Sequence, residues 1–248
     1  MRLVLVVALL TSLMACGRKP APAPTAPPDA SGLPMAVTPV AADMAAPASP
    51  TANARPTDGP ALWTKYCALC HGPEAKGYAA DNAPSLVSDT FSSTASDDFL
   101  RLAIERGRPG TAMAGYAKTW GGPLEPAEVD TLIAFLRAKG KPYQALPPVA
   151  LSGDVQRGKA LYDQKCADCH GTPDQRKTAV HLANSLLLQS ASDAFLRYAI
   201  VNGRPGTPMP AWGGQLKDNE IDDVLAYVRS LAQPAPPPMP PTIGRAHV

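Results

Sequence analysis

Aromatic residues are scarce in this 248-residue sequence: they make up 6% of it, and only four are phenylalanine. That scarcity argues against an all-β fold built around an aromatic-rich core. Net charge is also nearly absent, at +2 at pH 7, which excludes the strongly basic surface of a nucleic-acid binder. The sequence also has no long apolar run. The mostly apolar stretch over residues 3–14 is too short to cross a bilayer, which takes about 20 residues.

Proline, by contrast, is abundant and unevenly placed. Of 29 prolines, eleven fall in residues 17–60 and six in residues 234–248. Segments this rich in Pro, Ala, Thr and Ser cannot bury enough apolar surface to fold. We therefore expect a disordered spacer over residues 16–58, a disordered tail over residues 234–248, and a folded part between them.

The N-terminus has the features of an export signal. Arg2 precedes the short apolar run, and Leu13-Met14-Ala15-Cys16 resembles a bacterial lipoprotein box. This predicts a signal peptide over residues 1–15 and lipidation of Cys16, the cysteine left over when the other four are paired. The alternative is a plain cleaved signal followed by an incidental cysteine. The lipoprotein interpretation places the protein in the bacterial periplasm or at the cell surface, anchored to a membrane by lipid.

One sequence unit occurs twice in the folded part. The segment Cys67-Ala-Leu-Cys70-His71-Gly72 recurs 99 residues later as Cys166-Ala-Asp-Cys169-His170-Gly171, and the segment 107–113 recurs 96 residues later as 203–209. A repeat of this kind indicates tandem copies of one domain. We expect domains over residues 59–141 and 153–233, joined by a linker over residues 142–152.

Each copy has the pattern of a small helical bundle, so the expected fold class is all-α. Apolar residues at helical spacing (Val129, Leu132, Ile133 and Leu136, repeated as Ile221, Val224, Leu225 and Val228) predict a last helix with one buried face. Pro126 suits the first turn of the first of these helices. A middle helix is expected to begin after Ser96 or Ser192 and to stop at Gly107 or Gly203.

The repeated Cys-x-x-Cys-His is the attachment motif of a covalently bound c-type haem. On a helical turn, two thiols three residues apart reach the two vinyl groups of one porphyrin edge, and the adjacent histidine projects toward the iron. Three alternatives use the same cysteines. A redox pair of the thioredoxin type needs a βαβ context, which this sequence lacks. A zinc ribbon does not suit pairs separated by 95 residues in repeated domains. Disulfides leave the histidine after each pair unexplained.

Through these motifs the chain resembles class I cytochromes c, twice over. The resemblance implies two covalently bound haem c groups, each with its iron held by the motif histidine and by a methionine late in the domain. Met113 and Met209, each following Gly-Arg-Pro-Gly-Thr, are the only methionines within the two expected domains. The implied haem-binding residues are Cys67, Cys70, His71, Met113, Cys166, Cys169, His170 and Met209, of which the histidines and methionines are the metal ligands.

Four other side chains have hydrogen-bond donors suited to a second role at the expected haems. Arg108, Arg204, Trp120 and Trp212 are candidates for contacts to the haem propionates. The alternatives are a solvated loop arginine and ordinary packing of the indole rings.

The family orients its iron-bound histidine with the backbone carbonyl of a loop proline, and Pro84 matches that position. The second copy departs from this pattern, because Asn184 stands at the proline position in the nearest match. His181 is an alternative to Met209 as an iron ligand, and His247 is expected to be free.

An iron with two strong axial ligands changes valence without changing ligands, which suits electron transfer. We therefore expect a lipid-tethered dihaem electron carrier with no catalytic residue. Its partners would be redox proteins such as a quinol-oxidising complex, a terminal oxidase or a dehydrogenase, and not nucleic acid. Two alternatives stay open: a haem enzyme, such as a dihaem peroxidase or sulfur-compound oxidoreductase, and an electron-accepting subunit of a larger dehydrogenase or oxidase complex.

Overall fold

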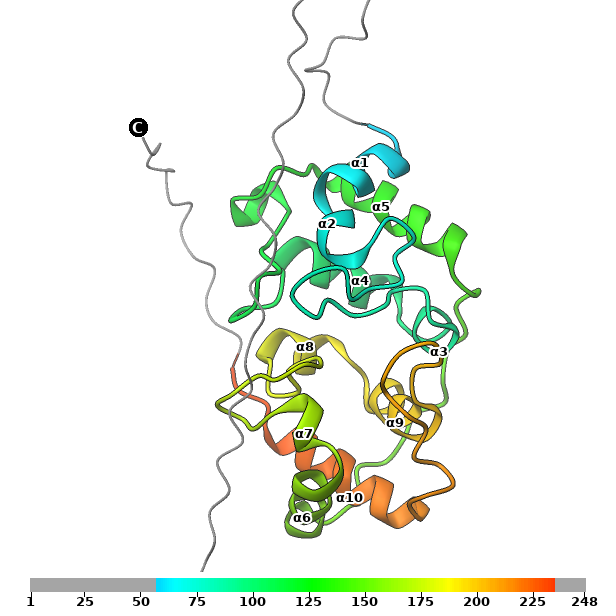
Figure 1. Cartoon of the computed structure of the whole chain (residues 1–248), viewed down its shortest axis with the longest axis vertical. Helices are drawn as coiled ribbons and strands as arrows, with labels where there is room; N and C mark the ends of the chain where they lie inside the picture. The colour runs from blue at the N-terminus through cyan, green and yellow to red at the C-terminus, as the bar shows by residue number, and fades with distance from the viewer. Residues whose placement is uncertain (1–56, 235–248) are drawn as a thin grey trace, which may run out of the picture. The chain divides into compact units, whose positions relative to one another are not determined.

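The computed structural model describes residues 57–234, which lie within one compact unit of the chain (Figure 1). The predicted signal peptide, the lipidation site Cys16, nearly all of the spacer and tail, and His247 lie outside the described residues. Every regular element between residues 57 and 234 is a helix, apart from two isolated β-bridges. The predicted all-α fold is therefore confirmed.

The helices form two sets of five that follow the sequence repeat. A 3-10 turn, η1 (Lys118–Trp120), is an addition to the first set. It lies where the first copy is four residues longer than the second, because Trp120 follows Met113 by seven positions and Trp212 follows Met209 by three. The first set is α1 (Gly59–Tyr66), α2 (Ala68–His71), α3 (Asp89–Ser92), α4 (Asp97–Arg106) and α5 (Pro126–Lys139). The second set is α6 (Val155–Lys165), α7 (Ala167–His170), α8 (Ser185–Ser190), α9 (Asp193–Asn202) and α10 (Asp218–Ser230).

The predicted helix starts are confirmed by hydrogen bonds at the N-caps. The Ser96 hydroxyl accepts from the Phe99 amide at 3.1 Å, and the Ser192 hydroxyl accepts from the Phe195 amide at the same distance. Each cap satisfies an amide that has no partner within its helix. Pro126 occupies the first turn of α5, where its missing amide hydrogen has no cost.

The predicted helix stops are confirmed as well. Helix α4 ends at Arg106 and α9 ends at Asn202, each followed by a glycine C-cap. Gly107 adopts a φ of 68°, and a Cβ there would lie 2.3 Å from the Met113 carbonyl oxygen. Only glycine allows the chain to leave the helix and fold back onto itself so closely.

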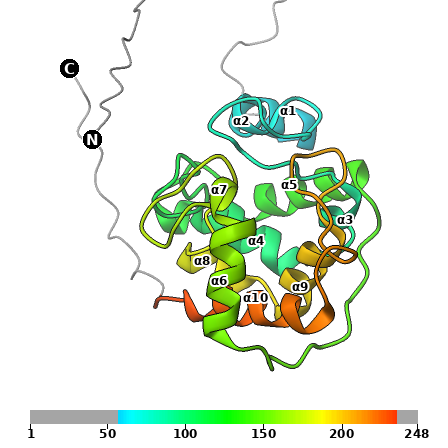
Figure 2. The same cartoon turned by 60° about the horizontal axis from the view of Figure 1, so that its bottom comes forward.

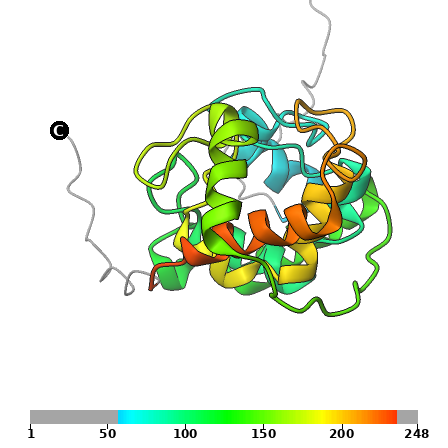
Figure 3. The same cartoon turned by 90° about the horizontal axis from the view of Figure 1, so that it is seen from below.

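The first and last helices of each set pack together and contribute much of its core. Figures 2 and 3 both show α10 lying across α6. A Cβ on Gly158 of α6 would stand 1.8 Å from the Asp223 carbonyl oxygen of α10, so the two backbones touch at a glycine. Tyr162 and Leu225 are completely or almost completely buried at this crossing, as Leu62 and Leu132 are in the first set. In each set, the Cys-x-x-Cys-His segment directly follows the first helix of this pair, α1 in the first set and α6 in the second.

An arginine on the last helix of each set anchors the corner between the third and fourth helices. Arg137 of α5 donates to the carbonyls of Ser92 at 2.8 Å and Ala95 at 2.5 Å. Arg229 of α10 donates in the same way to a carbonyl within α8 and to another just after it. Charged donors to carbonyls that lack a helical partner are among the stronger hydrogen bonds in proteins.

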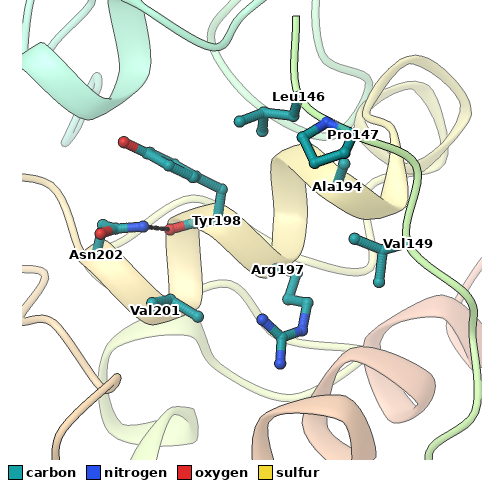
Figure 4. Close-up of a pocket in the computed structure, with 8 residues that line it drawn as sticks. All are labelled: Leu146, Pro147, Val149, Ala194, Arg197, Tyr198, Val201 and Asn202. Atoms are coloured by element: carbon teal, nitrogen blue, oxygen red, sulfur yellow. Dashed lines mark hydrogen bonds between the residues drawn. The ribbon is translucent and has the colours of Figure 1, made fainter. Parts of the chain in front are cut away.

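The stretch between the two sets runs along the outside of α9. Leu146, Pro147 and Val149 form one wall of a pocket of about 170 Å³, and α9 residues that include Tyr198 and Asn202 form the other (Figure 4). None of the eight predicted haem-binding residues lines this pocket.

The two sets also contact each other directly. The Phe195 ring of α9 lies 5.0 Å from the Phe99 ring of α4 and 6.1 Å from the Phe91 ring of α3, measured between centroids. The Thr90 hydroxyl donates to the Gly203 carbonyl at 2.7 Å. This shared cluster lies among the segments that lead to both methionine loops.

Candidate haem sites

Each Cys-x-x-Cys-His segment forms one helical turn immediately after the first helix of its set. Cys67 and Cys166 cap the turns α2 and α7, and the second cysteine and the histidine lie within them. None of these four thiols forms a disulfide. Burial, followed by repulsion from the neighbouring cysteine, raises the pKa of Cys67 to about 12 and that of Cys166 to about 11. Redox-active Cys-x-x-Cys pairs have lowered pKa values instead.

The motif histidines are oriented through one ring nitrogen. His71 Nδ1 lies 3.0 Å from the Pro84 carbonyl oxygen, and His170 Nδ1 lies 2.7 Å from the Val180 carbonyl oxygen. A carbonyl only accepts, so Nδ1 carries the proton and donates it. The lone pair of Nε2 is then free for a metal, which is the usual arrangement of a metal-bound histidine. His71 is also buried.

The carbonyl on His170 corrects the expected register of the second loop. It belongs to Val180, not to Asn184. The motif histidine and the residue that supplies its carbonyl are 13 positions apart in the first set and 10 in the second, so the second loop is three residues shorter. Val180 matches Pro84 at the offset of 96 that relates the downstream halves of the repeat.

Asn184 has a different role. Its side-chain oxygen accepts from the Leu187 amide at 3.0 Å and so caps α8, while its Nδ2 donates to the Pro109 carbonyl of the first set at 2.8 Å. The residue is buried. It therefore joins the second set to the methionine loop of the first.

The two methionines end matching loops. The Arg108 amide donates to the Met113 carbonyl at 2.8 Å, and the Met113 amide donates to the Thr111 hydroxyl at 3.1 Å. Around Met209 the corresponding distances are 3.0 and 3.2 Å. The repeated hydrogen bonds fix both methionines at the same point relative to the helix that precedes them.

In the second set, the predicted residues line one cavity of about 190 Å³. Cys166, Cys169 and His170 come to it from α7 and its cap, whereas Met209 comes from the loop after α9. Val224 and Val228 of α10 form an apolar wall. A cavity with two thiols, a free imidazole nitrogen, a thioether and apolar walls has the donor set that a His/Met-ligated haem c requires. The residues present therefore fit this group.

Arg108 and Arg204 are half-buried next to phenylalanine rings. Burial lowers the pKa of each guanidinium to about 10. Neither pairs with a carboxylate of residues 57–234: Arg108 lies 5.2 Å from the Phe99 ring centroid, and Arg204 lies 5.0 Å from that of Phe195. Arg204 also donates to the Thr90 carbonyl at 2.9 Å. A desolvated cation is costly without an anion, and a haem propionate would supply one.

Trp120 and Trp212, the two candidates for propionate contacts, have different surroundings in the structure. Trp212 lines the cavity of the second set. Trp120 instead packs against Arg106, whose guanidinium carbon is 4.2 Å from a ring centroid of the indole. His181 does not line the cavity, and its Nε2 lies 2.9 Å from the Thr172 carbonyl oxygen.

One pair of contacts was not expected from the sequence. The Trp63 indole donates to the Gly72 carbonyl at 3.0 Å, and the Tyr162 hydroxyl donates to the Gly171 carbonyl at 2.9 Å. Both bonds tie the first helix of a set to the residue that follows the motif histidine. Trp63 and Tyr162 occupy matching positions of the repeat, 99 residues apart. That match is the sequence signal by which their shared role could have been predicted.

The zinc alternative finds no support in the described part of the chain. Among residues 57–234, no three His, Cys, Asp or Glu side chains come together in a group that could hold a metal ion. The second cavity offers the donors of a porphyrin-bound iron instead.

No helix of residues 57–234 is long and apolar enough to cross a membrane.

Comparison with known proteins gives two matches to one family model. The model is described as cytochrome c oxidase, cbb3-type, subunit III, and it matches residues 54–136 and 153–228, together more than half of the chain. The two matched ranges follow the two helical sets.

Curated relatives agree with this match. A cbb3-type cytochrome c oxidase subunit CcoP of Azospirillum sp. (strain B510) is 31% identical over 192 residues, covering 70% of this chain and 61% of the relative. A FixP subunit of Bradyrhizobium sp. (strain ORS 278) is 30% identical, covering 70% and 60%. A cytochrome c6 of Diacronema lutheri is 32% identical over 88 residues, covering 32% of this chain and 99% of its own length. The chain thus spans about 60% of the length of the oxidase subunits it matches.

Proposed function

Because the chain belongs to the family of subunit III of cbb3-type cytochrome c oxidases, we propose that it is a membrane-tethered electron carrier that delivers electrons to a terminal oxidase. The chain is a tandem class I cytochrome c and carries two covalently attached haem c groups, one for each family match. When bound, haem iron supplies one-electron redox chemistry. The chain's own residues hold it, orient it and limit access to it.

We assign the two haem sites to matching residues of the two sets. The thiols of each motif would hold the haem through thioether bonds, the motif histidine would provide Nε2 to the iron, and the late methionine would provide its sulfur. The residues of the first site are Cys67, Cys70, His71 and Met113, and those of the second are Cys166, Cys169, His170 and Met209. Arg108 and Arg204 pair with propionates, which would satisfy both desolvated guanidinium groups.

The placement of His170 and Met209 on one cavity is the observation that carries this function. With a histidine nitrogen and a methionine sulfur both given to the iron, no coordination site would be left for a substrate. A dihaem peroxidase or sulfur-compound oxidoreductase needs an iron with an open or exchangeable ligand. The donor set therefore favours a carrier over an enzyme.

Oxidation of the reduced protein tests the proposed partner. Ferrous protein, mixed in air-saturated buffer with membranes that contain a cbb3-type oxidase, should be oxidised at least several-fold faster than with membranes lacking that oxidase. The loss of the ferrous haem absorbance measures the rate. Equal rates with both membranes would exclude the oxidase as the acceptor and favour another redox complex.

We also propose that Cys16 bears the lipid that tethers the carrier. Cys16→Ser should move the protein from the membrane fraction to the soluble fraction, because the diacylglycerol is attached through the thiol. Mass spectrometry of the mature N-terminus provides the direct measurement. An unlipidated terminus in the unaltered protein would contradict the tether.

A further inference from the structure

A short loop of the first helical set lies against the haem cavity of the second. Tyr78 and Asn82 line this cavity together with Cys169, His170 and Met209. All other residues that line it belong to the second set. The second site is thus completed by the other half of the repeat. We call residues 77–82 the bridging loop.

The same loop is fastened to the first attachment motif. The Gly77 amide donates to the His71 carbonyl at 2.8 Å, and the amides of Ala79 and Ala80 donate to the Cys70 carbonyl at 3.2 and 3.3 Å. Its backbone therefore follows the first motif while two of its side chains reach the second cavity.

The backbone of this loop is unusual. Tyr78, Asp81 and Asn82 have φ values of 58°, 49° and 52°, and with Ala75 they are the only non-glycine residues of the described chain with positive φ. Asp and Asn tolerate this region, but a bulky residue such as tyrosine adopts it at a cost. Strain of this kind persists where the surroundings fix it, and it gathers at functional sites. The conformation turns the Tyr78 ring toward the second set.

An ion pair holds the bridging loop against the second set. The Arg176 guanidinium donates to both carboxylate oxygens of Asp81, at 2.7 and 3.1 Å, and to the Asp81 backbone carbonyl at 2.8 Å. Arg176 lies in the loop between His170 and Val180. A forked contact of this kind fixes orientation as well as distance.

We propose that the bridging loop is part of the second haem site: Tyr78 and Asn82 shield the second haem from water and raise its midpoint potential, and the Asp81–Arg176 pair keeps the loop closed. The inference rests on the proposed assignment of Cys166, Cys169, His170 and Met209 to that haem. Tyr78 is here a positioning and shielding residue and makes no bond to the iron.

The direction of the effect follows from charge. The ferric haem core carries one more positive charge than the ferrous core, and a water-poor surrounding disfavours the more charged form. Apolar cover around a metal site controls solvent access and through it the reduction potential. Removing the Tyr78 ring should therefore lower the potential of the second haem. The first haem, whose motif is joined to this loop by backbone hydrogen bonds, should change little.

Tyr78→Asn is the decisive variant, because asparagine keeps the left-handed backbone and removes the ring. An optical redox titration should show the second midpoint potential shifted down and the first in place. Met209→Ala identifies which transition belongs to the second haem. Tyr78→Phe retains the ring and should leave both potentials unchanged. Tyr143→Asn is the matched control, since Tyr143 is 46% exposed against 43% for Tyr78 and does not line the cavity.

The ion pair is tested by a double-mutant cycle. Asp81→Asn and Arg176→Gln should each lower the second potential, and the double variant should lower it no further than the larger single effect. Purely additive shifts would mean that the two residues act independently and that no clamp exists.

The failure of this inference differs from the failure of the proposed function. If the protein carries two haems and Met209→Ala moves one transition, but Tyr78→Asn moves neither or both equally, the bridging loop is no part of the second site. If Met209→Ala moves no transition, the assignment of the second haem itself is wrong.

Discussion

Replacing Cys67 and Cys70 together by alanine is expected to remove one of the two covalent haems and leave the other attached. Each motif forms its own helical turn at the end of its own first helix, so loss of one pair of thiols leaves the other pair in place. The bound mass and the haem absorbance should therefore fall by half. Intact-mass spectrometry after acid–acetone extraction measures both attachment and number.

The Cys166→Ala/Cys169→Ala variant is the matched control and should lose the other haem. A set of about 80 residues has little core of its own, so each variant should also unfold at a lower temperature than the unaltered protein. Unchanged haem content in either variant, or one haem in the unaltered protein, would contradict the two-site account.

Removing a methionine ligand is expected to have the second large effect. On the proposed ligation, Met209→Ala takes away the thioether that favours ferrous iron, and His/Met ligation gives the higher potentials among haems with histidine. Axial ligands span about 0.8 V, so a fall on the order of a tenth of a volt or more is expected at one haem. About half of the far-red sulfur-to-iron charge-transfer band should disappear with it. Met113→Ala should give the same loss at the other haem.

His181 and water are the two candidates to replace Met209 at the iron. The His181 Nε2 lies on the Thr172 carbonyl, so this histidine must give up that contact to reach the iron. Met209→Ala should then yield a water-bound iron instead of a bis-histidine one. Electron paramagnetic resonance distinguishes the two, and the double variant Met209→Ala/His181→Ala is the control. A bis-histidine signal that vanishes in the double variant would show that His181 can move.

Much of the fold could be predicted from local sequence signals. The serine caps, the glycine stops and the apolar faces act within one helix, and each of them is found where the pattern predicts it. The two attachment motifs are equally local, because their residues lie on one helical turn. Duplication strengthened each of these signals, since the same residues recur in both copies.

Contacts between distant segments could not be predicted in the same way. The carbonyl that accepts from His170 belongs to Val180, because the second loop is shorter by three residues. The most similar sequence to the Pro84 segment surrounds Asn184, which placed the wrong residue at this position. Nothing in the sequence of residues 77–82 shows that Tyr78 reaches the other copy. Such a contact depends on how the two sets pack, and packing leaves no periodic pattern in either segment.

Carbon monoxide binding to the reduced, unaltered protein tests the central claim most directly, because carbon monoxide requires a ferrous iron with an open or displaceable ligand. Two histidine–methionine haems should show almost no change of the ferrous spectrum under carbon monoxide. Met113→Ala and Met209→Ala should each gain one binding haem and so calibrate the signal. Ready binding by one haem of the unaltered protein would contradict the account, because that iron would then be open to substrate and the chain would be a haem enzyme.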